Sequence, residues 1–104
     1  MIIEMRTYTI KPGELNNFLN IYDKEIRKIH IETLGNQIGF FYTEIGNLNE
    51  VVHLYGYKSF EDRQKRRSVL SKTPEFKSYI SKVKNLIIDM KNQLMQPAEF
   101  SKIK

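Results

Sequence analysis

The stretch from Leu34 to Tyr57 carries large side chains at most of its positions, and it constrains the fold more than any other feature. Two runs of β-branched and aromatic residues flank Gly46-Asn47-Leu48-Asn49, a pattern that predicts a β-hairpin in which Tyr42 faces His53. Both faces of this hairpin hold bulky side chains. Because a short chain has too little helix to cover both faces, we expect a second copy of the chain to cover one of them.

Strand and helix signals alternate around this hairpin. Residues 2–10 predict a strand, residues 14–33 predict one long amphipathic helix, and residues 86–96 predict a last strand. With the hairpin and a second helical region, the order is βαββαβ, which is the ferredoxin-like arrangement of the α+β class. We expect a single domain over residues 1–104, with a four-stranded antiparallel sheet and its helices on one face.

The second helical region has clear start signals. Ser59, with Asp62 three residues later, is typical of a helix N-terminus. Thr73 followed by Pro74 predicts that the helix restarts there, because proline suits the first helical position. Gly35 suits the left-handed residue that follows the end of the first helix.

Alternation along the strands divides the sheet into two faces. We expect the helices to cover an apolar set, namely Ile3, Met5, Phe41, Val52, Leu54, Ile88 and Met90. The opposite face then holds Glu4, Arg6, Tyr8, Phe40, Tyr42, His53, Tyr55, Tyr57, Asp89 and Lys91. An aromatic patch of this size is rarely left in water, so the pattern predicts a homodimer whose two sheets lie back to back.

Composition narrows the remaining choices. The chain has no cysteine, which excludes disulfides and thiolate metal sites and fits a reducing compartment. No apolar run reaches the length of about 20 residues that crosses a bilayer, and the start of the chain does not resemble a signal peptide. We therefore expect a cytoplasmic protein. The net charge is +5, and residues 63–84 carry the basic excess.

The chain resembles the NIPSNAP family in several separated segments that occur in the family's order. These are residues 1–13, residues 39–46 with 51–55, the arginine-rich segment 62–67 and the tail 97–101, where Glu99 replaces an expected second proline. The resemblance implies a dimeric α/β barrel, a version of the ferredoxin-like fold. The family's animal members are linked to mitochondria and vesicle traffic, and no catalytic residue set comes with the resemblance.

A set of polar and aromatic residues on the sheet is the first candidate site. Charged and aromatic side chains on a buried sheet face can line a pocket for a small molecule. The same residues also fit a hydrogen-bonded network inside a dimer interface, since buried polar groups need partners in either case. The candidate ligand-binding residues are Glu4, Arg6, Tyr8, Tyr42, His53, Tyr55 and Tyr57.

The histidines carry open alternatives. His53 fits either a general base or a core histidine that is bonded to Tyr42 or the backbone. His30 fits a favourable charge near a helix end. The two are too far apart in the sequence to form a metal motif, so we expect no metal site, and no sequence motif predicts a cofactor.

The basic segment is the last candidate. Arg63, Arg66 and Arg67 are a candidate anion-binding set, although most charge runs on helices are solvated faces. The sequence has no RNA-binding motif, and a dimerised sheet is not free to stack bases, so we expect no nucleic-acid partner.

Two functions remain open from the sequence. One is a homodimeric module that binds a small organic ligand or a protein partner. The other is a cofactor-independent enzyme of the dimeric α/β-barrel monooxygenase type, in which His53, Tyr55, Tyr57, Arg6 and Glu4 bind and polarise the substrate. The second rests on fold-level analogy.

Overall fold

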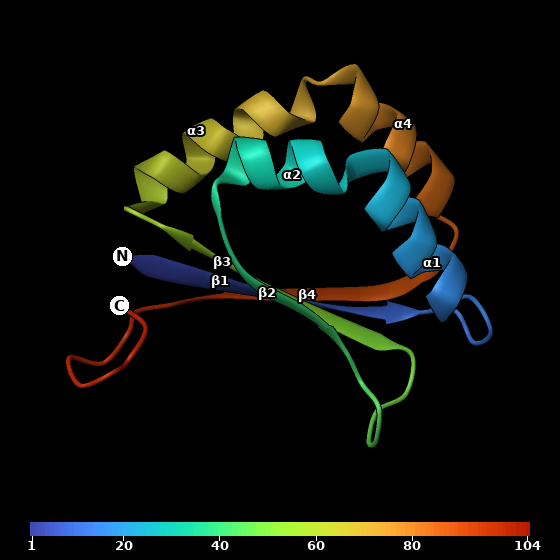
Figure 1. Ribbon diagram of the computed structural model, residues 1–104, viewed down its shortest axis with the longest axis horizontal. Coiled ribbons are helices and arrows are strands. Elements are labelled where there is room, and N and C mark those ends of the chain that lie inside the picture. The colour runs from blue at the N-terminus through green and yellow to red at the C-terminus, as the bar shows by residue number, and fades with distance from the viewer.

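A single antiparallel sheet forms the base of the molecule in the computed structural model, which describes residues 1–104. Its strand order is β2-β3-β1-β4, the ferredoxin-like order that the sequence predicts. The strands are β1 (Ile2–Ile10), β2 (Asn36–Tyr42), β3 (Glu50–Tyr57) and β4 (Ile87–Met95). All helices lie on one face of the sheet, and no helix covers the other face (Figure 1).

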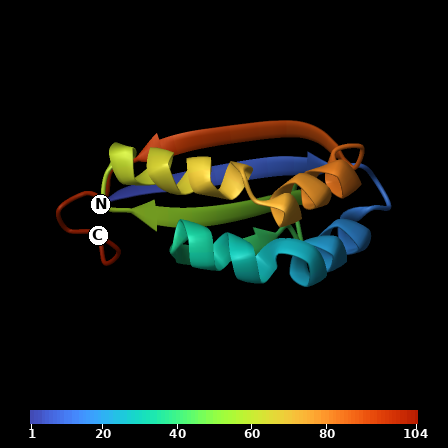
Figure 2. The ribbon, with the colours of Figure 1, turned by 90° about the horizontal axis from the view of Figure 1, so that it is seen from above.

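The helices form two rows above the sheet. The first row contains α1 (Leu15–Ile21), a π-helical turn η1 (Tyr22–Ile26) and α2 (Arg27–Leu34), and the second contains α3 (Phe60–Ser71) and α4 (Pro74–Val83). Seen from above, β4 runs along the sheet edge on the far side of α3 and α4 from the first row (Figure 2). No helix here combines the length and the apolar character that crossing a bilayer requires.

The first helix contains a π-helical turn that the sequence analysis did not predict. The buried residues of this row recur every fourth position, namely Phe18, Tyr22, Ile26, His30 and Leu34. An α-helix has about 3.6 residues per turn, so a spacing of four rotates the side chains steadily around the helix. The wider turn at Tyr22–Ile26 offsets part of this rotation, and the five side chains therefore stay directed at the sheet.

The predicted assignment of the sheet faces is wrong. Glu4, Tyr55 and His53 lie under the helices and are at most 3% exposed. The helices supply partners for Glu4 and Tyr55, whereas an apolar face could not have satisfied the arginine side chains that α3 brings to the sheet. The face without helices holds instead the apolar set Ile3, Met5, Phe41, Val52 and Leu54.

The last strand differs from the other three. Met90 pairs with Tyr8 and Leu94 pairs with Glu4, so both lie on the helix side of the sheet, as the sequence analysis expected for Met90. Asp89 and Lys91 pair with Thr9 and Thr7, which belong to the other set, so they do not join the face of Glu4 and Tyr8 as the sequence analysis expected. Met90 is still 53% exposed, because β4 lies beyond the helical rows.

The hairpin is shorter than predicted. The strand β2 ends at Tyr42, which pairs with Val51, while His53 pairs with Phe40. The register therefore differs by two residues from the predicted pairing of Tyr42 with His53. A shift of two leaves each side chain on the same face, because the side-chain period of a strand is two.

Two predicted helix caps are confirmed. The Ser59 Oγ accepts a hydrogen bond from the Asp62 backbone N–H at 3.1 Å. The Thr73 Oγ1 accepts one from the Phe76 N–H at 3.2 Å and donates one to the Leu70 carbonyl at 2.8 Å. Thr73 thus joins the end of α3 to the start of α4.

We predict that Thr73→Ala lowers the free energy of unfolding by about 1–2 kcal/mol, because it removes both of these hydrogen bonds. Urea titration monitored by circular dichroism measures the loss. The matched control is Ser78→Ala, an exposed position on α4, which should change stability by less than about 0.5 kcal/mol. Equal effects of the two variants would contradict the capping role.

Candidate functional site

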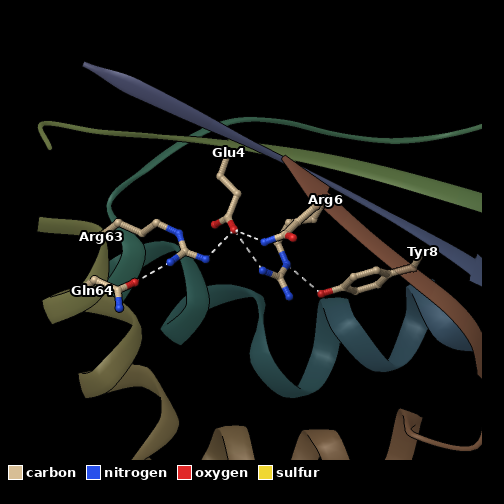
Figure 3. A network of polar contacts seen from close by, with 6 residues as sticks. Glu4, Arg6, Tyr8, Arg63 and Gln64 are labelled. Carbon is tan, nitrogen blue, oxygen red and sulfur yellow. Dashed lines mark hydrogen bonds and ion pairs between the residues drawn. The ribbon is translucent and has the colours of Figure 1, made fainter. Parts of the chain in front are cut away.

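A buried carboxylate at Glu4 links β1 to α3. Its Oε2 accepts hydrogen bonds from Arg63 at 2.7 Å, Asn92 at 2.9 Å and Arg6 at 3.1 Å (Figure 3). Burial alone would raise the pKa of Glu4, but the hydrogen bonds from Arg63 and Asn92 and the two arginine charges lower it to about 2. Glu4 is therefore ionised at neutral pH although it is fully buried.

The guanidinium of Arg6 extends this network along the strand. Its Nη1 donates to Glu4, and its Nε donates to the Tyr8 hydroxyl at 2.9 Å (Figure 3). Its remaining nitrogen, Nη2, has no hydrogen-bond partner within the protein. Arg6 therefore still has a donor group to offer.

A second polar group joins the first helix row to β3. The His30 Nδ1 lies 2.7 Å from the Tyr55 hydroxyl and 2.9 Å from the Tyr22 hydroxyl. The Gln37 amide donates to both hydroxyls, at 2.8 Å to Tyr55 and 3.2 Å to Tyr22. Each tyrosine and the histidine Nδ1 thus has partners, as buried polar groups generally do.

His30 has a different role from the one expected. Burial, together with the charges of Arg67 and Arg6, lowers the pKa of His30 to about 3, so the ring is neutral at pH 7. The prediction of a favourable charge at a helix end is therefore wrong. The spacing of four from Phe18 through Tyr22 and Ile26 was a signal in the sequence that could have placed His30 on the buried stripe.

His53 is buried but has no polar partner. It is 3% exposed, and neither ring nitrogen makes a hydrogen bond. Its ring stacks on Phe40 at a centroid distance of 4.8 Å and meets the edge of Tyr8 at 5.0 Å. The pKa of His53 is lowered to about 3, mainly by burial and to a smaller extent by the positive charges around the ring. The ring is therefore uncharged at neutral pH, so one of its nitrogens is a hydrogen-bond donor and the other is an acceptor.

A cavity of about 410 Å³ lies beside His53, between the sheet and the helices. Most of its wall is apolar or aromatic, and the rest is polar or charged. The residues that line it are Arg6, Tyr8, Phe18, Tyr22, His30, Phe40, His53, Arg67, Phe76, Tyr79, Ile80, Val83, Lys84, Ile87, Ile88, Asp89 and Met90. Such a mixture is typical of small-molecule sites.

The structure brings together part of the candidate ligand-binding set. Arg6, Tyr8 and His53 line the cavity. Glu4 lies behind Arg6 in the buried network and does not line the cavity, and Tyr55 is fully buried. Two tyrosines complete the set: Tyr57 is buried with Arg67 near its hydroxyl and does not line the cavity, and Tyr42 is 55% exposed and lies outside the cavity.

The three arginines of the basic segment do not act as one group. Arg63 binds Glu4, and Arg66 binds Asp62 at 3.0 Å and the Thr33 carbonyl at 3.2 Å. Arg67 lines the cavity. The interpretation of this segment as a solvated face is therefore wrong for these arginines, which are all half-buried.

Sequence reasoning missed the helical part of the wall. Tyr22, His30, Phe76 and Tyr79 all line the cavity. Tyr22, Phe76 and Tyr79 lie at helical spacing on the apolar stripes of their helices, and a stripe alone does not reveal whether it closes against the sheet or leaves a space.

We predict that acidification destabilises the protein before its carboxylates titrate. The unfolded histidines bind protons near pH 6.5, whereas His30 and His53 in the folded state do so only near pH 3. Between these values the unfolded state holds more protons, so stability falls as the pH falls, by about 2 kcal/mol per histidine at pH 5. Urea titrations between pH 7 and about 5 measure this slope.

The variant His53→Phe tests the assignment of this effect. Phenylalanine keeps the ring that stacks on Phe40 but cannot bind a proton. We expect the slope between pH 6.5 and about 5 to fall to roughly half of the original value. An unchanged slope would show that His53 is not a buried neutral group.

Comparisons with known proteins agree with this geometry. The NIPSNAP family model matches residues 3–102. The "Protein NipSnap homolog" of Dictyostelium discoideum is 33% identical over 96 residues, which are 92% of this chain and 42% of that protein. The chain thus spans about two fifths of that relative.

Solved structures show the same fold. Protein Atu4242 from Agrobacterium tumefaciens aligns over 100% of both chains with a TM-score of 0.97 and 36% identity, and a second structure describes it as a NIPSNAP family protein with unknown function. A putative antibiotic biosynthesis monooxygenase from Nitrosomonas europaea shares the fold, with a TM-score of 0.70, at 11% identity over 93% of this chain and 98% of its own. The match across nearly the whole chain and the likeness of the fold together show that this chain belongs to the NIPSNAP family.

Proposed function

We propose that this chain is a small-ligand-binding domain that acts as a homodimer and holds its ligand in the cavity beside His53. The observation that supports this most is the state of the His53 ring. It is buried, it lies at the cavity wall, and neither nitrogen has a partner within the protein. Because buried polar groups are normally hydrogen-bonded, an unpartnered ring at a cavity wall favours a polar occupant beside it.

The alternative of a purely structural network explains only part of the site. It accounts for one oxygen of Glu4 and for Tyr55, whose partners are within the protein. It does not account for His53 or for an adjacent space of about 410 Å³. Small-molecule sites span roughly 300–1,000 Å³, so the size of the cavity favours a small ligand over a protein partner.

The second candidate function is a cofactor-independent enzyme of the monooxygenase type. The shared fold with the Nitrosomonas protein is compatible with it, but a fold does not carry a function. General bases work best when their pKa lies near the operating pH, and the pKa of His53 is about 3. We therefore favour ligand binding over proton abstraction by His53.

The homodimer in this proposal uses the sheet face without helices. Its central positions are apolar, with Ile3 and Met5 on β1 and Val52 and Leu54 on β3, and Phe41 beside them is 56% exposed. A second copy offers the same apolar surface, so a two-fold axis would match the face with itself. This differs from the interface expected from the sequence, because the aromatic face is already covered. The cytoplasmic location and the absence of a cofactor stay predictions.

We predict that protein purified from its own host retains a small molecule, which native mass spectrometry detects as added mass on the folded chain. His53→Phe should reduce the retained fraction at least tenfold, because it removes both unpartnered nitrogens and keeps the ring packing. Tyr42→Phe is the matched control, since Tyr42 is exposed and lies outside the cavity. A ligand-free wild-type chain would contradict the proposal.

We predict that the wild-type chain has the mass of two copies in dilute solution by light scattering. Leu54→Lys places a charge in the middle of the bare sheet face and should yield folded monomers, as judged by light scattering with circular dichroism. Ser78→Lys, on the exposed surface of α4, should leave the dimer intact. A monomeric wild type would contradict the proposed interface.

A further inference from the structure

The charges around the cavity do not balance. The cavity wall contains the cations Arg6, Arg67 and Lys84 and the single anion Asp89. Behind the wall, Glu4 and Arg63 neutralise each other. With His30 and His53 neutral at pH 7, the region holds an excess of two positive charges.

Arg67 lines the cavity without an acidic partner. It makes no ion pair and lies near the Tyr57 hydroxyl, which cannot balance its charge, whereas its neighbours Arg63 and Arg66 on α3 pair with Glu4 and Asp62. Lys84, the other cation of the wall without an ion pair, is exposed. The charges of Arg67 and Arg6 both lower the pKa of His30 and of His53, which indicates that the two guanidinium groups lie near the same two rings. A half-buried guanidinium without a carboxylate is unusual, because charges removed from water are generally paired.

The apolar part of the wall lies toward one end of the cavity. Along the sheet, Arg6 pairs with Asn92, Tyr8 pairs with Met90, and Ile10 pairs with Ile87. The wall therefore changes from cationic near Arg6 to mainly apolar near Ile87, where α4 adds Ile80 and Val83. The two charged residues at this end, Lys84 and Asp89, are exposed and have opposite charges. Ile80 and Met90 are 40% and 53% exposed, so the apolar end is also where the cavity meets solvent.

From this arrangement we infer that the ligand is an organic carboxylate with an apolar body, whose carboxylate binds Arg67 and the free Nη2 of Arg6 and whose body lies along Ile80, Val83 and Ile87. This inference rests on the proposed ligand-binding function and names the class of ligand. A carboxylate has two oxygens in one plane, which suits paired N–H donors of arginine. His53 then has a polar group beside it, and the excess of positive charge is reduced.

Isothermal titration calorimetry with matched probes tests the inference. The probes are phenylpropionate and octanoate, their neutral counterparts phenylpropanol and octanol, and the cation phenylpropylamine. We expect each carboxylate to bind the wild-type chain at least tenfold more tightly than the alcohol with the same body, and the amine to bind most weakly. Carboxylate binding should also weaken as salt is added, while alcohol binding should not.

Arg67→Gln supplies the second readout. It should weaken carboxylate binding about tenfold or more and leave alcohol binding unchanged, because only the charged contact is lost. Lys65→Gln is the matched control, since Lys65 is an exposed cation on the same helix and does not line the cavity.

The possible failures are distinguishable. If the alcohols bind as tightly as the carboxylates, or if Arg67→Gln weakens both classes equally, the carboxylate inference is overturned and the ligand-binding function stands. If none of the five probes binds, the result counts against the cavity as a ligand site and overturns both.

Discussion

The buried ion pair between Glu4 and Arg63 is the interaction on which the rest of the structure depends. A carboxylate that is fully removed from water needs a cation, and Arg63 of α3 supplies one at 2.7 Å. Because Arg63 lies on a helix and Glu4 on β1, the pair requires the helices to cover the face that holds Glu4. It thereby decides which face of the sheet is buried and which one remains bare.

Because the covered face of the sheet is polar, the first helix row has to supply hydrogen-bond partners for it. Tyr22 and His30 approach Tyr55 of β3, and the π-helical turn keeps these two residues on the side of the sheet. The network closes on itself around Tyr55, whose hydroxyl has three partners. His53, two residues earlier on the same strand face, has none, and the cavity begins there.

The cavity also exists because the layer of helices is narrower than the sheet (Figure 2). The edge strand β4 extends beyond the helical rows (Figure 2), and the exposed side chains of Ile80 on α4 and Met90 on β4 line the cavity where it opens to solvent. Apolar residues of both elements line that opening, while Arg6 and Arg67 stand further along the wall. The cavity of this chain thus has a cationic end near Arg6 and a mainly apolar end near Ile87.

Local signals in the sequence were enough to determine the order of the elements, the bounds of β1 and the caps at Ser59 and Thr73. These features depend on neighbouring residues alone, through side-chain branching, backbone hydrogen bonds and proline geometry. They also placed Arg6, Tyr8 and His53 on one face, because alternation along a strand is local.

The sequence did not determine which of the two faces the helices cover. Alternation along a strand separates its side chains into two sets, but it does not say which set faces the helices. Only the tertiary structure decided that, because the choice depends on Arg63 and Tyr22 reaching partners far away in the sequence, and it also made His30 part of the buried network.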